Sequence, residues 1–185
     1  MIVIFLSHIL GIIGSSGLLW HENRTFTFNT LKSFGFGKRS LQDKIIEEVQ
    51  KLLKTLEDTK GEIFTLKPLV QGVFSNIVTS IVFNQRYDYD DPKMSEIRDL
   101  IHQQLADSEF AGALDILPIL EKLPGDLFHS KRLKAVEKRL EEFMRQHIDE
   151  HKRSLDDDNH RDFTDAYLSE IKKNGNNGND VFFGN

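Results

Sequence analysis

The chain has 185 residues, enough for one domain with a buried core, and a formal net charge of -5 at pH 7. This acidic balance argues against general nucleic-acid binding, which needs a basic surface. The sequence contains no cysteine, which excludes disulfides, thiolate metal sites and a cysteine nucleophile within these residues. A hydrophobic share of 39% beside a charged share of 29% is typical of soluble helical proteins.

The first residues, MIVIFLSHILGIIG, are apolar but too short to span a bilayer as a helix. They lack the positive start and the A-x-A cleavage site of a signal peptide. We expect a buried loop or short helix here, or a misplaced start codon, and residues 1–7 fit no element. The overlapping GIIGSSG lacks the Lys-Ser/Thr end of a P-loop, so it indicates backbone flexibility before a helix.

Two helices are predicted next, separated by the glycine-rich break SFGFGK. Ser16 can cap the first helix, which runs to about Thr30. Ser40 and Asp43 form a capping box for the second, and Gly61 ends it. The second helix carries an amphipathic stripe made of Ile45, Ile46, Val49, Leu52, Leu53 and Leu56.

The segment TLKPLVQGVFSNIVTSIVF is apolar around most of its circumference. Its length favours a buried helix, although its Val and Ile content leaves a strand open. Asp91 and Pro92 then begin another helix as N-cap and first residue. The apolar residues of that helix are Met94, Ile97, Ile101 and Leu105.

The segment DILPILEKLPGD contains two prolines and is predicted to be an irregular connector. Ser130 caps a long charged helix that runs to about Arg153, and RDFTDAYLSEIKK forms a last short helix. The inward side of the long helix carries Leu133, Val136, Leu140, Phe143, His147 and Ile148. We therefore predict an all-α fold in a single domain over 1–185, helical over 8–173 and ending in a linker at 174–185.

The sequence HIDEH matches the H-x-x-E-H order of some zinc peptidases, in which two histidines bind metal. Imidazoles four residues apart on a helix can share one ion. The flanking sequence is densely charged, however, so we expect His151, Asp149 and Glu150 to face water, with His147 on the inner edge. No third ligand stands out, and the acidic runs DYDDPK and LDDDNHRD lack the spacing of a calcium loop. We predict no metal site.

Trp20 and Arg24 lie four residues apart and therefore share one face of the first helix. Both side chains donate hydrogen bonds and accept none, which suits them to an anion. The alternative is a half-buried tryptophan with an arginine stacked on it, which contributes less than about 1 kcal/mol at the surface.

The segment GIIGSSGLLWHENRTFTFNTLKSFGFGKRSLQDKIIEEVQKL resembles the cytochrome P-450 haem-thiolate monooxygenases of the animal microsomal family-2 type. The likeness continues through SNIVTSIVFNQRYDYDD, LPILEKLPGDLFHSKRLK and RDFTDAYLSEI, and it covers residues 10–172. These segments follow the family's order from helix C to about helix H. The resemblance therefore implies a partial cytochrome P-450 fold that lacks the haem-thiolate loop.

By this resemblance, Trp20 and Arg24 donate hydrogen bonds to a haem propionate, and Ile12 lies in the loop over the haem. The substrate-binding residues that it implies are Ile13, Ile101, Gln104, Leu105 and Ser108. No residue of this chain can be the catalytic thiolate. Thr25 stands where family members often have a second arginine, and Gly14 where they often have a larger residue.

The resemblance also implies that the whole enzyme inserts one oxygen atom from O2 into a lipophilic substrate, using haem iron. Its electrons would come from an NADPH-dependent reductase at the cytosolic face of the endoplasmic reticulum membrane. We expect a fragment or truncated gene product, without membrane anchor and inactive alone, because the axial cysteine lies elsewhere. The alternative is a non-enzymatic helical binding protein or a pseudogene product.

Overall fold

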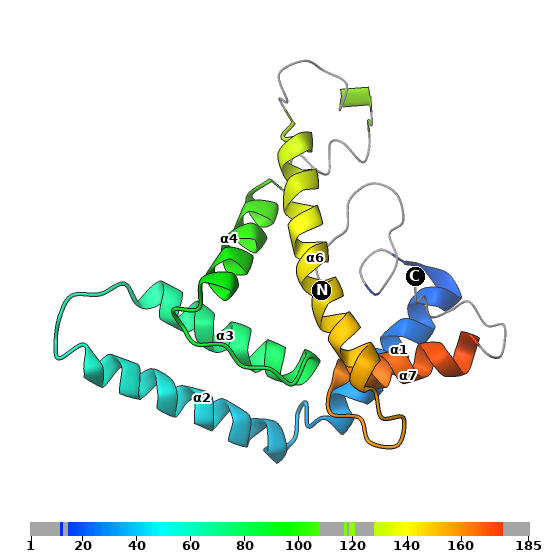
Figure 1. Cartoon of the computed structure of the whole chain (residues 1–185), viewed down its shortest axis with the longest axis horizontal. Coiled ribbons are helices and arrows are strands. Elements are labelled where there is room, and N and C mark those ends of the chain that lie inside the picture. Colours follow the sequence, from blue (N-terminus) through cyan, green and yellow to red (C-terminus); the bar gives the residue numbers. More distant parts are fainter. Residues whose placement is uncertain (1–11, 13–14, 108–116, 118, 121–127, 176–185) are drawn as a thin grey trace.

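The computed structural model describes residues 12, 15–107, 117, 119–120 and 128–175. These residues form six α-helices, and none of them lies in a β-strand (Figure 1). The helices are α1 (Gly17–Ser33), α2 (Arg39–Asp58), α3 (Leu66–Val82), α4 (Pro92–Ala106), α6 (Ser130–Ser154) and α7 (Phe163–Gly175). The predicted all-α class is confirmed, and the apolar central segment is a helix and not a strand.

The helices pack mainly as pairs. In Figure 1, α2 runs back along α3 on one side of the molecule, and α1 and α7 lie together on the other. Helix α6 stands between these groups and contacts α4 along one part and α7 near its C-terminal end. Helix α3 also contacts α7, so the ends of α3, α6 and α7 meet at one junction.

The apolar core lies where the segment after α3 meets α4 and α6. Phe83, Met94, Ile97 and Phe143 form a buried cluster there. The rings of Phe83 and Phe143 pack edge to face, with their centroids 6.5 Å apart. This cluster fixes the middle of the long α6 against the first turns of α4.

Helix α4 begins as predicted. Asp91 occupies the N-cap position, and its side chain accepts a hydrogen bond of 2.9 Å from the backbone N–H of Met94. Pro92 follows as the first helical residue, where its missing N–H costs no hydrogen bond.

Two other predicted helix starts are corrected, and the position of a third is confirmed. Helix α2 begins at Arg39, so Ser40 lies inside its first turn and the predicted capping box is wrong. The helix starts early because the carbonyl of Lys38 already accepts a backbone hydrogen bond from Leu41. Helix α6 includes Ser130 as its first residue, and the N-cap position falls on the residue before it. The N-cap position of α1 is Ser16, as predicted, but its side chain makes no capping hydrogen bond.

Gly61 lies beyond the end of α2, in the turn that leads to α3. Helix α2 ends at Asp58, and Gly61 has a φ of 87°, a left-handed conformation that glycine adopts without strain. The glycine therefore reverses the chain and does not cap the helix.

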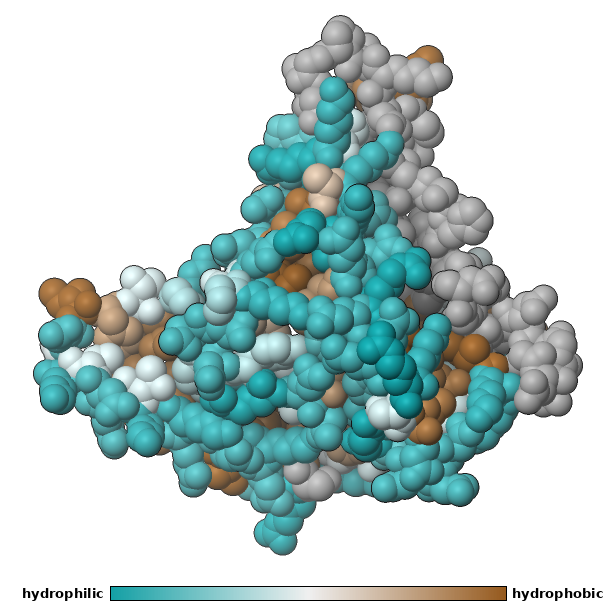
Figure 2. Space-filling view, viewed as in Figure 1, coloured by the Kyte–Doolittle hydropathy of each residue, from teal (hydrophilic) through white to brown (hydrophobic). Residues whose placement is uncertain are grey.

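Much of the apolar surface of α2 and α3 is left uncovered by the described residues. On α2, Ile46 is 44% exposed and Leu53 is 52% exposed. On α3, Phe74 is 66% exposed and Val78 is 57% exposed, although Val73 beside them is buried. Figure 2 shows hydrophobic side chains on the surface at the α2–α3 end of the molecule. The stripe predicted on α2 exists as a pattern, but most of it is not buried.

Candidate anion site on the first helix and the buried histidines

Trp20 and Arg24 form a stacked group on α1 together with Phe28. The guanidinium carbon of Arg24 lies 5.3 Å from the centroid of the Trp20 ring and 4.7 Å from that of the Phe28 ring. A cation at such distances from an aromatic ring is attracted to it. Phe28 was not predicted from the sequence, although its position four residues after Arg24 is the same signal that singled out Trp20.

The opposite side of α1 anchors the helix to α7. Asn23 is buried, and its side-chain oxygen accepts a hydrogen bond of 3.3 Å from the hydroxyl of Tyr167. The rings of Phe26 and Tyr167 pack edge to face at 5.6 Å. These contacts hold one side of α1 against α7. The side that carries Trp20 and Arg24 therefore faces outward, and both residues are exposed.

Arg24 keeps its charge available for a ligand. The ion pairs formed within the described ranges join other cations to other carboxylates, and none includes Arg24. Its planar guanidinium can give two parallel hydrogen bonds to one carboxylate. The group therefore combines a fixed cation with an indole donor at an exposed, partly apolar edge, which suits a carboxylate attached to an apolar molecule.

The residues predicted to bind substrate lie on other elements. Ile12 is half-buried in a turn before α1, whereas Ile13 and Ser108 fall outside the described residues. On α4, Ile101 packs against the core cluster, Gln104 is buried and Leu105 is 58% exposed. Leu105 is thus the described α4 residue with the most exposed apolar surface, and the roles of Ile12 near the cofactor and of the five predicted substrate residues remain predictions.

Of the two histidines of HIDEH, one lies as predicted and one does not. His147 is buried, as expected for the inner edge, but His151 is also buried, with only 5% of its surface exposed. The expectation that His151 faces water is wrong because the chain folds back after α6. That reversal places Asp162 against α6, with its Oδ2 atom 2.7 Å from Nε2 of His151. The sequence offered no local signal for this pair.

The two histidines do not turn toward a common point. Nδ1 of His147 lies 2.8 Å from the carbonyl oxygen of Phe143, and Nδ1 of His151 lies 2.7 Å from that of His147. Each ring is therefore tied to the preceding turn of its own helix. This arrangement does not match the shared-ion geometry of an H-x-x-E-H site.

A second group of potential ligands, His151, Asp162 and Asp165, has ligand atoms within 4.8 Å of one another. Both oxygens of Asp165 already accept hydrogen bonds from the Arg161 guanidinium, at 2.6 and 2.9 Å. Asp162 binds His151 with one oxygen and accepts the backbone N–H of Asp165 with the other. With its oxygens occupied and a guanidinium beside it, the group is better explained as an ion-pair network than as a metal site.

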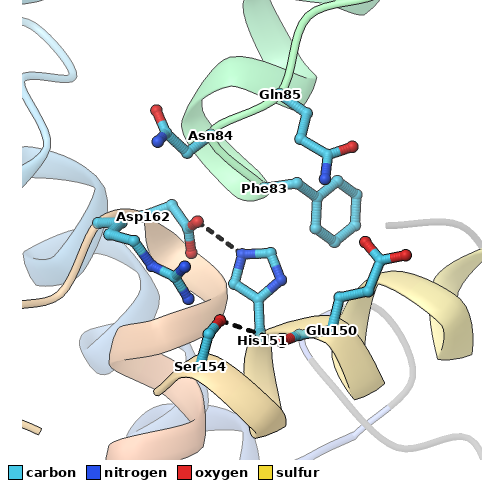
Figure 3. A pocket seen from close by; sticks show the side chains of 8 residues that line it. Phe83, Asn84, Gln85, Glu150, His151, Ser154 and Asp162 are labelled. Atoms are coloured by element: carbon cyan, nitrogen blue, oxygen red, sulfur yellow. Dashed lines mark hydrogen bonds and ion pairs between the residues drawn. The ribbon is translucent and has the colours of Figure 1, made fainter. Parts of the chain in front are cut away.

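A small pocket of about 260 Å³ opens beside this network (Figure 3). Its walls come from the segment after α3, from α6 and from the residues before α7, and they consist of Phe83, Asn84, Gln85, Glu150, His151, Ser154, Arg161 and Asp162. Only one of these side chains is a large hydrophobic. The pocket is therefore unsuited to a lipophilic molecule.

Comparison with known proteins identifies the family. The family profile described as Cytochrome P450 matches residues 5–181. Cytochrome P450 2J1 of Oryctolagus cuniculus is 36% identical over 166 residues, which cover 88% of this chain and 32% of the rabbit protein. The chain belongs to the cytochrome P450 family. The resemblance stated from the sequence, including its family-2 type, is thereby confirmed.

Other cytochrome P450 relatives show the same coverage. Cytochrome P450 2J2 of Homo sapiens is 34% identical over 170 residues, covering 90% of this chain and 33% of the human protein. Cytochrome P450 2C3 of Oryctolagus cuniculus is 33% identical over 166 residues, covering 89% of this chain and 33% of the rabbit protein. The chain thus spans about a third of the length of the curated relatives it matches. In the part of the chain that the structure describes, no helix is long and apolar enough to cross a membrane.

Proposed function

We propose that this chain is the part of a haem-dependent monooxygenase that holds a haem propionate through Trp20 and Arg24. The observation that carries the proposal is the stacked, exposed guanidinium of Arg24, which pairs with no described carboxylate. A propionate is an anion at the edge of an apolar ring system, and such an anion binds well to charge-assisted donors in a partly desolvated place. The residues present therefore fit the group.

The aromatic rings prepare Arg24 for this role. Trp20 and Phe28 flank its guanidinium and so restrict the rotamers of the Arg24 side chain. The side chain therefore loses less conformational entropy when it binds an anion. The indole N–H of Trp20 adds a second donor on the same face of α1. The haem, when bound, supplies the iron at which O2 is activated, and the cysteine that ligates this iron must come from outside these 185 residues.

The proposed reaction inserts one oxygen atom from O2 into a lipophilic substrate. Ile12 would lie near the haem, and Ile13, Ile101, Gln104, Leu105 and Ser108 would contact the substrate. Exposure of the apolar Leu105 on α4 supports an apolar ligand at that face. We further propose that electrons come from an NADPH-dependent reductase and that the whole enzyme acts at the endoplasmic reticulum membrane.

The test is a chimera in which this chain replaces the matching third of Cytochrome P450 2J1. We expect Arg24→Ala to weaken haem retention by about 1.5–3 kcal/mol, the usual contribution of a hydrogen bond to a charged group. Trp20→Phe keeps the ring and removes one donor, so it should cost less. Arg24→Lys should recover only part of the loss, because a point charge replaces a planar fork. Haem retention is measured by absorbance during competition with apomyoglobin.

Arg145→Ala is the control, because Arg145 is also exposed but pairs with Glu141 on α6. It should leave haem retention unchanged. If Arg24→Ala and the parent chimera retain haem equally, the Trp20–Arg24 pair is surface stacking and the proposed propionate contact is wrong.

A further inference from the structure

The ends of α3, α6 and α7 meet around one buried ion pair. His151 and Asp162 are 5% and 1% exposed, respectively, and the contact between them is 2.7 Å long. Figure 3 shows His151 at the centre of this junction, with Asp162 on one side and Phe83 on the other. Thr164, two residues after Asp162, donates a hydrogen bond to the carbonyl oxygen of Val82, which ties α7 to the end of α3.

Both ring nitrogens of His151 face atoms that can only accept hydrogen bonds. Nδ1 lies 2.7 Å from the carbonyl oxygen of His147, and Nε2 lies 2.7 Å from a carboxylate oxygen of Asp162. A neutral imidazole has one N–H, so either tautomer would set a nitrogen lone pair against an acceptor. Only the doubly protonated ring satisfies both contacts, and a buried lone-pair clash is costly.

The other charges around the ring also favour the extra proton. Glu150 comes from α6, Arg161 from the residues before α7 and Asp165 from its first turn, while the segment after α3 lines the pocket with the uncharged Phe83, Asn84 and Gln85. The pKa of the Asp165 carboxyl is lowered: burial raises it, but hydrogen bonds from Arg161 outweigh burial, and charge on His151 adds to them. With a neutral His151, the carboxylates of Asp162 and Asp165 would share a single guanidinium, that of Arg161.

We propose that His151 and Asp162 form a proton-dependent clamp that holds α7 against α6 and the end of α3. The proton on His151 closes the clamp, and its loss opens it. The contact with Asp162 therefore stabilises the junction while both ring nitrogens carry protons, and it destabilises the junction when Nε2 is bare, because a lone pair then faces the carboxylate. The clamp uses none of the residues proposed to hold haem or substrate.

Asp162→Asn provides a sharp test because it keeps the geometry and removes the need for the proton. The amide oxygen of Asn can still accept the backbone N–H of Asp165, and its NH2 can donate to a neutral Nε2 of His151. We expect histidine-selective 15N NMR of the 185-residue chain at pH 7 to show two protonated ring nitrogens for His151. In Asp162→Asn the same residue should show one protonated and one bare nitrogen, with the signal assigned by its absence in His151→Gln.

Hydrogen exchange of the α6–α7 peptides, followed by mass spectrometry, tests the clamp itself. At pH 6 the parent chain should be more protected than Asp162→Asn, and at pH 9 the order should reverse. His160→Gln is the control. Nε2 of His160 contacts only the Ser169 hydroxyl, which can accept as well as donate, so no second proton is required. It should not reverse the order of protection between pH 6 and pH 9.

Two results would overturn the clamp. One is a neutral His151 in the parent chain at pH 7, with a single protonated nitrogen. The other is an α6–α7 protection ratio between parent and Asp162→Asn that does not change from pH 6 to pH 9. Neither result bears on haem retention by the chimera, so the two proposals can fail separately.

Discussion

Glu48 shows how a single side chain can organise several elements. It is 5% exposed, although its neighbours on α2 are largely exposed hydrophobics. Its carboxylate accepts hydrogen bonds from Asn76 on α3 at 2.9 Å, from Arg86 at 3.1 Å and from the Tyr89 hydroxyl at 2.8 Å. It therefore joins α2, α3 and the segment between α3 and α4.

The pKa of Glu48 is held below its usual value. Burial acts to raise it, but the hydrogen bonds from Asn76, Tyr89 and Arg86 outweigh burial. Because the folded pKa is lower than the unfolded one of about 4.3, the stabilisation is fully present above pH 4.3. It is lost as the pH falls through the folded pKa.

We expect Glu48→Gln to lower the free energy of unfolding at pH 7 by about 1–3 kcal/mol, because buried donors lose a charged acceptor. Urea denaturation followed by circular dichroism at pH 7 and pH 3.5 measures this. The difference between the variant and the parent should shrink at the lower pH. The control is Glu47→Gln, since Glu47 is exposed and pairs only with Lys51 along the same helix. Equal losses for the two variants would contradict the role assigned to Glu48.

At the scale of the element, the N-terminus of α4 depends on Asp91. Its side chain accepts one hydrogen bond from the N–H of Met94, a residue of the buried core cluster. Asp91→Ala should therefore cost about 1 kcal/mol of stability, the usual contribution of an N-cap. The Met94 amide should lose protection in hydrogen exchange. Asp91→Asn keeps an acceptor at the same position and should cost much less; if it costs as much as Asp91→Ala, the cap is not the cause.

The helix boundaries separate reliable local signals from unreliable ones. Asp91-Pro92 is an unambiguous start, because one residue caps and the next cannot extend a preceding helix. The Ser40–Asp43 spacing matches a capping box just as well, yet α2 starts at Arg39. The backbone turn before α2 determines where this helix starts. That turn depends on Gly35 and Gly37, which have φ values of 96° and 75°.

At the scale of the whole molecule, the main feature is an apolar face of α2 and α3 that the described residues leave uncovered. Phe74 and Val78 lie four residues apart on α3 and are 66% and 57% exposed. Exposed apolar patches of this kind mark an interaction surface or favour aggregation.

We expect the isolated 185-residue chain to self-associate and to bind a dye that fluoresces on apolar surfaces. Phe74→Gln and Val78→Gln together should reduce both effects without loss of helical content. Val73→Gln is the control, because Val73 is adjacent but buried, and it should destabilise the fold. Size-exclusion chromatography and dye titration measure the outcome. A monodisperse parent chain without dye binding would instead favour the non-enzymatic helical protein.

The sequence by itself determined the family, the all-α class, the start of α4 and the shared face of Trp20 and Arg24. These features depend on residue order and on contacts within about one helical turn, where spacing along the chain is also spacing in space. Phe28 was within reach of the same reasoning. The HIDEH pattern, by contrast, has the residue spacing of a zinc site, but the residues around its two histidines do not form one.

Only the tertiary structure decided which polar residues are buried. The partner of His151 is 11 residues away, across a chain reversal, and the partners of Glu48 are 28 to 41 residues away. The charged sequence around His151 predicted exposure, yet α7 covers it, while apolar residues on α2 and α3 remain exposed. Burial depends on which helices pack together, and helix packing is set by contacts between distant segments, which local periodicity does not encode.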